Sequence, residues 1–233
     1  MSGILYGVGV GPGDPELMTL KAVRLIKEND IIAVPGADVR ETVAYKIAVQ
    51  AVPELADKEL LPIYMPMTHD KAELELNHEK GAKALEAALD TGKNVVFLTL
   101  GDPTIYSTYM YIHRIVKAKG YETTIISGIP SFCAAAARMD DSLVDRAEEL
   151  HVIPSSYGIE AALNYSGTKI LMKSASGISE VKRTLEEKDG NVNVKMIENC
   201  GMPEERIYER IEDVPEQAGY YSLLIVKESE KER

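Results

Sequence analysis

Short apolar runs alternate with longer amphipathic stretches along the whole chain. In the first half, runs typical of buried strands lie at residues 4–10, 31–34, 59–64, 94–100 and 123–126. Between them, apolar residues recur at helical spacing over residues 17–29, 41–52, 71–91 and 105–116. Strands separated by helices favour parallel pairing, so this half predicts an α/β fold with a mainly parallel sheet.

The second half keeps this alternation with looser spacing. Further strands are predicted at residues 149–153, 169–173, 192–197 and 221–226, and helices at residues 158–164 and 177–187. The last two strands lie close together in the sequence and are separated by the polar segment 198–219, so they are expected to add antiparallel pairs. A boundary after residue 120 would divide the chain into an N-terminal α/β domain (1–120) and a C-terminal α/β domain (121–233).

The charge balance narrows the range of partners. Lys and Arg number 26 against 37 Asp and Glu, for a net charge of −11. Such a chain is a poor general binder of nucleic acid or of an anionic membrane surface. The beginning of the sequence lacks the basic segment of a secretory signal, and no apolar stretch reaches the about 20 residues of a spanning helix. Two cysteines, Cys133 and Cys200, form no disulfide framework. We therefore expect a cytoplasmic protein with free thiols.

A glycine-rich loop follows the first predicted strand, where residues 7–15 read GVGVGPGDP. The spacing does not satisfy the dinucleotide fingerprint, and the loop lacks the Lys-Ser/Thr ending of a phosphate-binding loop. Its prolines and acidic residues also suit a phosphate poorly, because Pro has no N–H and Asp repels an anion. The loop favours close approach to a ligand without phosphate, including a cationic one. A tight turn without any ligand stays open as the alternative.

A second loop, LGDPTIYS at residues 100–107, follows the clearest predicted strand. Ligands of open α/β sheets gather beyond the carboxyl ends of the strands, so the two Gly-Asp-Pro loops are expected to face the same side. Asp102 could accept a hydrogen bond from a ligand or orient backbone amides, or it could be an ordinary helix-capping residue.

A third segment, SGIPSFCAAAA at residues 127–137, offers small residues that allow close packing against a flat ligand or a helix. The four histidines, by contrast, show no metal-ligand spacing, so no metal is expected; they are His69, His78, His113 and His151.

Taken together and in this order, the three loops resemble the tetrapyrrole (cobalamin and siroheme) methylase family over essentially the whole chain. The GxGPGDP opening with its LMTLKA helix and the LGDP loop resemble the two signatures of that family. The segments GDPTIYSTY at 101–109, PIYMPM at 62–67 and IPSFCAAAA at 129–137 are most similar to its precorrin-2 C(20)-methyltransferase branch. One departure is Ser127 before Gly128, where many relatives carry Pro-Gly.

The resemblance implies two α/β domains with a ligand trough between them, S-adenosylmethionine as methyl donor, a tetrapyrrole substrate and a homodimer. Carried over position by position, the cofactor contacts fall at Pro12, Gly101, Asp102, Ile105, Ser131, Phe132 and Met172. No protein nucleophile is implied, since a reduced tetrapyrrole supplies an electron-rich carbon. The proton acceptor stays open among Asp102, Tyr106 and a substrate carboxylate. Because the substrate carries many carboxylates, basic residues such as Arg40, Lys46 and Arg138 are expected to rim the trough.

The implied activity is S-adenosylmethionine-dependent methylation of the C-20 meso carbon of precorrin-2 or cobalt-factor II in cobalamin biosynthesis. Two alternatives stay open. One is methylation of another precorrin position or of a protein, as in diphthine synthase. The other is a non-catalytic sensor that uses the same loops.

Overall fold

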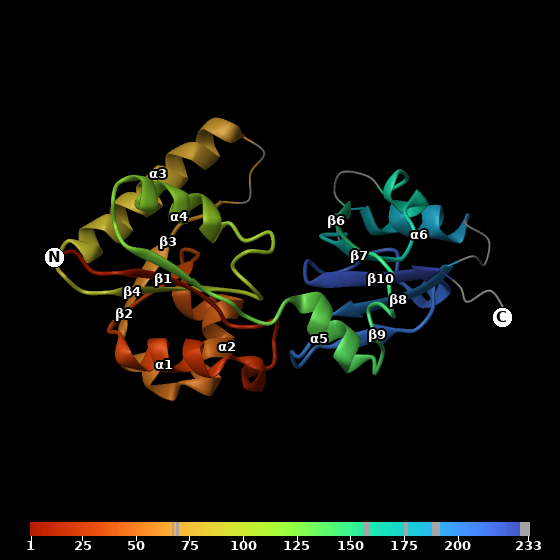
Figure 1. The fold of residues 1–233 in the computed structure, drawn as a ribbon, viewed down its shortest axis with the longest axis horizontal. Coiled ribbons are helices and arrows are strands. Elements are labelled where there is room, and N and C mark those ends of the chain that lie inside the picture. Colours follow the sequence, from red (N-terminus) through yellow and green to blue (C-terminus); the bar gives the residue numbers. More distant parts are fainter. Residues whose placement is uncertain (67, 69, 156–158, 175–176, 188–191, 229–233) are drawn as a thin grey trace. The chain divides into compact units, whose positions relative to one another are not determined.

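The computed structural model describes residues 1–66, 68, 70–155, 159–174, 177–187 and 192–228; Met67 of the PIYMPM segment and His69 lie outside these ranges. The chain forms two compact units, Met1–Pro130 and Ser131–Arg233, each with its own five-stranded sheet and its own helices (Figure 1). The sequence placed the division after residue 120. The first unit extends past that point because residues 123–126 pair with the first strand of its sheet.

The sheet of the first unit is parallel throughout and has the strand order β3-β2-β4-β1-β5. Its strands are β1 (Leu5–Gly9), β2 (Ile31–Pro35), β3 (Glu59–Ile63), β4 (Val95–Thr99) and β5 (Thr123–Ile126). The predicted parallel sheet is therefore confirmed for this half of the chain. Since all five strands run in one direction, the loops that follow them lie along one edge.

Helices cover both faces of this sheet (Figure 1). One face carries α1 (Leu20–Glu28) and α2 (Val43–Ala51), and the other carries α3 (Lys71–Leu89) and α4 (Tyr109–Ala118). Thr19, Thr42 and Asp70 cap the first three by accepting hydrogen bonds from backbone N–H groups of the first turn. Short 3-10 turns complete the unit at Pro15–Leu17, Val39–Glu41 and Pro53–Asp57. The fourth helix begins at Tyr109 rather than at residue 105, because side-chain hydrogen bonds hold the preceding residues in a loop.

The second unit has a mixed sheet of order β6-β7-β10-β8-β9, in which only the β6–β7 pair is parallel. Its strands are β6 (Leu150–Pro154), β7 (Thr168–Met172), β8 (Val192–Glu198), β9 (Arg206–Tyr208) and β10 (Ser222–Glu228). The expected antiparallel pairing of the last two predicted strands is confirmed by the β8–β10 ladder. The sequence missed β9, whose three residues are too few to show an alternating pattern.

Helices α5 (Ser131–Arg138) and α6 (Ile178–Glu186) belong to the second unit. Ile178, Val181 and Leu185 of α6 pack on the core side of β7, β8 and β10. The helix predicted over residues 158–164 is wrong within the described residues, where only a 3-10 turn forms at Ala162–Asn164. A further 3-10 turn spans Ile211–Asp213.

A buried lysine in β7 gives a first testable expectation. Lys169 is only 2% exposed, and its ammonium lies 3.6 Å from the carboxylate of Glu228, which is 60% exposed. A buried ion pair often stabilises a fold no better than an apolar side chain of similar size. We therefore expect Lys169→Met to keep or raise the melting temperature, whereas Lys169→Ala should cost about 2–5 kcal/mol through the cavity that it leaves. Thermal and urea unfolding measure both changes.

A double-mutant cycle provides the control. Glu228→Gln should destabilise the wild-type protein, because it leaves the buried ammonium without its carboxylate, and should change the stability of Lys169→Met very little. Equal losses in the two backgrounds would show that the ion pair contributes nothing.

Candidate functional site

Three loops meet at the carboxyl edge of the first sheet. They follow β1, β4 and β5, and these strands are neighbours in the order β4-β1-β5. The first two loops contact each other directly: the Gly101 N–H donates to the Gly11 carbonyl at 2.8 Å, and the Gly11 N–H donates to the Gly101 carbonyl at 3.3 Å. The two Gly-Asp-Pro loops thus lie side by side, as the sequence predicted.

Glycines make this approach possible. A Cβ atom at Gly128 would lie 2.1 Å from the Gly101 carbonyl oxygen, and one at Gly9 would lie 2.5 Å from the same oxygen. No side chain fits at those distances, so the backbones of all three loops touch without intervening side chains. Gly101 itself has φ of +66°, a conformation that glycine adopts without steric cost.

Asp102 ties the second loop to the third. It is only 7% exposed, and its Oδ2 accepts a hydrogen bond from the Gly128 N–H at 3.0 Å. Its Oδ1 accepts from the Thr104 N–H at 2.7 Å and from the Thr104 hydroxyl at 2.6 Å. Among the roles that the sequence left open, the structure thus assigns the orientation of backbone amides to this carboxylate.

Ser107 holds the far end of the second loop. Its hydroxyl lies 2.8 Å from the Thr99 hydroxyl at the end of β4, and it also accepts from the Tyr109 N–H at 3.3 Å. This hydroxyl pair was not predicted from the sequence. Its only signal was a polar residue at the end of an otherwise apolar strand.

The aromatic ring of Tyr109 packs against β1 on the face of the sheet that α3 and α4 cover. It packs where a side chain at Gly7 would lie, since a Cβ there would be 2.0 Å from the ring. Its hydroxyl lies 3.0 Å from Nδ1 of His113. Burial raises the pKa of the Tyr109 phenol, and burial with the nearby Lys117 and Arg114 lowers the pKa of His113. The phenol therefore stays protonated and can donate to a neutral imidazole.

The structure brings together four of the seven predicted cofactor residues. Gly101 and Asp102 lie in the loop contacts described above, Pro12 is buried in the first loop, and Ile105 is half-buried beyond Asp102. The loop residues 9–15, 100–107 and 127–130 contain no Lys or Arg. Asp14 caps the 3-10 turn Pro15–Leu17, because its Oδ1 accepts a hydrogen bond from the Glu16 N–H at 2.8 Å. These three loops are thus rich in backbone carbonyls and contain no cationic side chains.

The other three predicted residues belong to the second unit. Ser131 opens α5, and Phe132 is buried in the same helix. Met172 ends β7, and its carbonyl accepts a hydrogen bond from the Ser155 hydroxyl at 2.8 Å. Because Ser155 uses its one proton there, the buried Ser174 hydroxyl donates to Ser155 at 2.5 Å. This hydroxyl chain, which sequence reasoning missed, fixes the end of the strand that carries Met172.

The three basic residues that were expected to rim the trough form ion pairs or hydrogen bonds with other residues of the chain. Lys46 pairs with Glu41 at 2.7 Å, and Arg138 pairs with Glu205 at 2.6 Å. Arg40 donates to the Ala56 carbonyl at 3.3 Å. Their role in attracting a polycarboxylate stays a prediction.

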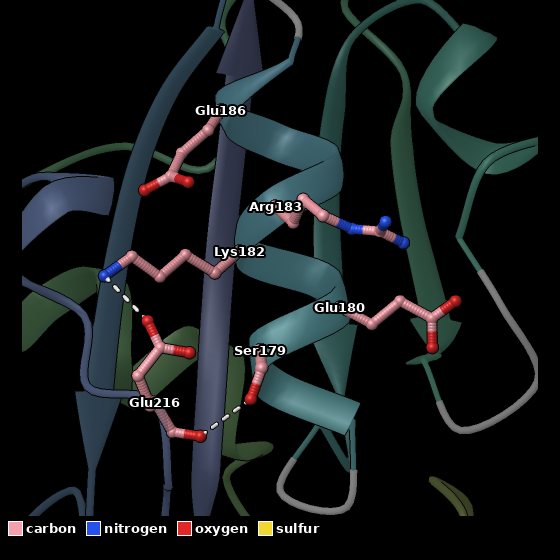
Figure 2. A pocket seen from close by; sticks show the side chains of 6 residues that line it. All are labelled: Ser179, Glu180, Lys182, Arg183, Glu186 and Glu216. Atoms are coloured by element: carbon pink, nitrogen blue, oxygen red, sulfur yellow. Dashed lines mark hydrogen bonds and ion pairs between the residues drawn. The ribbon is translucent and has the colours of Figure 1, made fainter.

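A surface hollow beside α6 is lined by side chains of both charges. In Figure 2, Lys182 extends toward Glu216, whereas Glu180 and Arg183 extend from the other side of the helix. The Lys182 ammonium donates to the Val214 carbonyl at 2.8 Å and to the Glu212 carbonyl at 3.4 Å, and it lies 3.6 Å from the Glu216 carboxylate. Ser179 donates to the Glu216 carbonyl at 2.9 Å. These contacts fasten α6 to the segment before β10, so the hollow is explained by packing within the unit.

The described residues also bear on metal binding and on membrane insertion. Within the ranges that the structure describes, no group of three or more His, Cys, Asp or Glu side chains is arranged to hold a metal ion. No helix there is both long and apolar enough to cross a membrane.

Comparisons with known proteins agree with one another. A family model described as Tetrapyrrole (Corrin/Porphyrin) Methylases matches residues 4–215. The chain is 33% identical over 227 residues to a probable cobalt-precorrin-2 C(20)-methyltransferase of Methanocaldococcus jannaschii, covering 96% of this chain and 95% of the relative. It is 29% identical to the cobalt-precorrin-2 C(20)-methyltransferase of Salmonella typhimurium, with 97% of each chain covered. The crystal structure of uroporphyrin-III C-methyltransferase from Thermus thermophilus with S-adenosylhomocysteine has a similar fold, with a TM-score of 0.71 at 21% identity, covering 97% of each chain.

Proposed function

The chain belongs to the tetrapyrrole methylase family, and we propose that it transfers the methyl group of S-adenosylmethionine to the C-20 meso carbon of precorrin-2 or cobalt-factor II in cobalamin biosynthesis. The observation that carries this proposal is the match over nearly the full length to relatives named for that reaction, at 33% and 29% identity. We further propose a cytoplasmic homodimer.

The loops of the first unit suit this methyl donor. S-adenosylmethionine carries a sulfonium cation and no phosphate. Three loops rich in backbone carbonyls and without Lys or Arg, which Gly9, Gly101 and Gly128 allow to lie close together, fit that chemistry. We propose that Pro12, Gly101, Asp102 and Ile105 contact the donor, together with Ser131, Phe132 and Met172 of the second unit.

When bound, S-adenosylmethionine supplies an electrophilic methyl group. The task of the chain is then to hold donor and acceptor in line, because positioning alone can supply much of the rate enhancement of a displacement. Asp102 contributes by keeping the loops in register, with both carboxylate oxygens already accepting hydrogen bonds from Thr104 and Gly128. This use disfavours Asp102 as the proton acceptor and leaves Tyr106 or a substrate carboxylate for that step.

The proposal is tested with the purified protein in two stages. Titration calorimetry should show binding of S-adenosylmethionine, with competition by S-adenosylhomocysteine. Incubation with precorrin-2 or cobalt-factor II under anaerobic conditions should then yield a product in which one methyl group has replaced one hydrogen, and NMR with a ¹³C-labelled methyl should place it at C-20. Binding without turnover would identify a sensor, and labelling elsewhere on the ring would identify a different methylase. Light scattering should give twice the 25.6 kDa of one chain.

A further inference from the structure

A tyrosine in the second loop has an unusual backbone conformation. Tyr106 has φ of +50°, in the left-handed region that residues with bulky side chains rarely adopt. Non-glycine residues there are usually Asn or Asp, whose short polar side chains tolerate the conformation. Such strain persists only where the surrounding structure imposes it, and it collects at functional sites.

The neighbouring residues impose this conformation. On one side, the Ile105 N–H donates to the Asp102 carbonyl at 3.2 Å, and Thr104 is bound twice to the Asp102 carboxylate. On the other side, Ser107 is held by the Thr99 hydroxyl, and its carbonyl accepts from the Met110 N–H at 3.3 Å. The chain must therefore turn at position 106 whatever residue stands there. Glycine or asparagine would make that turn with less strain, so the backbone does not explain the tyrosine.

Core packing does not explain it either. The Tyr106 side chain is 44% exposed and belongs to none of the hydrophobic clusters formed by the described residues. Tyr109, three residues later, is by contrast 1% exposed and packed against β1. The loop that carries Tyr106 follows a central strand at the edge where α/β sheets bind their ligands.

We propose that Tyr106 is a substrate-contacting residue whose aromatic face packs against the planar tetrapyrrole and thereby sets its affinity. This inference rests on the proposed function. An exposed aromatic ring held on a rigid turn offers a large apolar contact at little cost in side-chain freedom, which suits a flat macrocycle. The three loops carry no Lys or Arg, so at these loops a contact with the apolar face of the macrocycle is favoured over a contact with its peripheral carboxylates.

Three variants separate substrate contact from a structural role. Tyr106→Gly and Tyr106→Asn relieve the strain and should raise the melting temperature by about 2–4 °C. The same variants should raise KM for cobalt-factor II by about tenfold or more, while calorimetry gives a Kd for S-adenosylmethionine within about twofold of wild type. Tyr106→Phe keeps the ring and should stay within about threefold of wild type in KM.

Arg146→Gly is the matched control. Arg146 is an exposed residue of the second unit with a similar φ of +52°, so its replacement should raise the melting temperature equally and leave KM unchanged. Unchanged KM in Tyr106→Gly, or a lower melting temperature in both Tyr106→Gly and Tyr106→Asn, would overturn the inference. A wild-type protein that binds the donor and methylates neither tetrapyrrole would instead overturn the proposed function, and the inference with it.

Discussion

Replacement of Gly128 by alanine is expected to weaken the binding of S-adenosylmethionine severely. The new Cβ would lie 2.1 Å from the Gly101 carbonyl oxygen and 2.9 Å from the backbone of Gly9. These are backbone atoms of β-strand ends and hydrogen-bonded loops, so they cannot turn away as a flexible side chain could. The third loop must therefore separate from the other two, and the Asp102–Gly128 hydrogen bond breaks with it.

We expect this separation to cost about 1–3 kcal/mol of stability, as overpacking in a rigid site usually does. It should weaken donor binding by about 100-fold or more, because the carbonyls would no longer face the donor together. Titration calorimetry measures the affinity, and urea unfolding measures the stability.

Gly177→Ala is the control for a glycine without such neighbours. Its φ is −139°, and among the described residues no atom beyond its chain neighbours lies within 4 Å of the place where its Cβ would stand. That variant should bind the donor as the wild type does. If Gly128→Ala also bound the donor normally, the close packing of the three loops would be irrelevant to the site.

Replacement of Asp102 is expected to have the next largest effect. Asp102→Ala leaves the Gly128 N–H, the Thr104 N–H and the Thr104 hydroxyl without their acceptor. Hydrogen bonds to a charged acceptor contribute about 1.5–3 kcal/mol each, although solvent will replace some of them once the loop opens. We therefore expect a loss of about 3 kcal/mol in unfolding free energy and a tenfold or greater loss of donor affinity.

Asp102→Asn refines this test. The asparagine keeps one acceptor oxygen for Thr104, but its NH₂ group would face the Gly128 N–H. Because both groups are hydrogen-bond donors, the hydrogen bond to Gly128 is lost. The donor affinity of this variant should fall nearly as far as that of Asp102→Ala, with a smaller loss of stability.

Asp70→Ala serves as the matched control for a carboxylate that caps backbone amides. Asp70 accepts from the Ala72 and Glu73 N–H groups at the start of α3, at 2.9 and 3.2 Å, and belongs to none of the three loops. This variant should lose about 1 kcal/mol of stability and retain donor affinity. Equal losses of affinity in the Asp70 and Asp102 variants would show that the effect comes from stability alone.

Most of the first unit could be predicted because its signals are local. The central strands β1 and β4 are apolar runs between two helical layers, and α1, α2 and α3 each have their own capping residue. The second unit was harder, because its sheet is mixed and β9 is a three-residue edge strand. In the segment 158–164, Ile159 and Leu163 reach the core, but the described residues form only the 3-10 turn Ala162–Asn164, so apolar spacing alone did not predict the element correctly.

The sequence by itself determined the alternation of strands and helices, the parallel first sheet, and the loops that carry the candidate site with Pro12, Gly101 and Asp102. Only the tertiary structure decided what those residues do. It shows that Asp102 accepts a hydrogen bond from the Gly128 N–H and that Gly9 and Gly128 leave room for the Gly101 carbonyl. It also shows that the Tyr109 ring packs against Gly7. The reason is physical. Hydrophobic periodicity reports which residues are buried within one segment, whereas the partner of a carboxylate or an amide depends on which distant segments the fold brings within 3 Å.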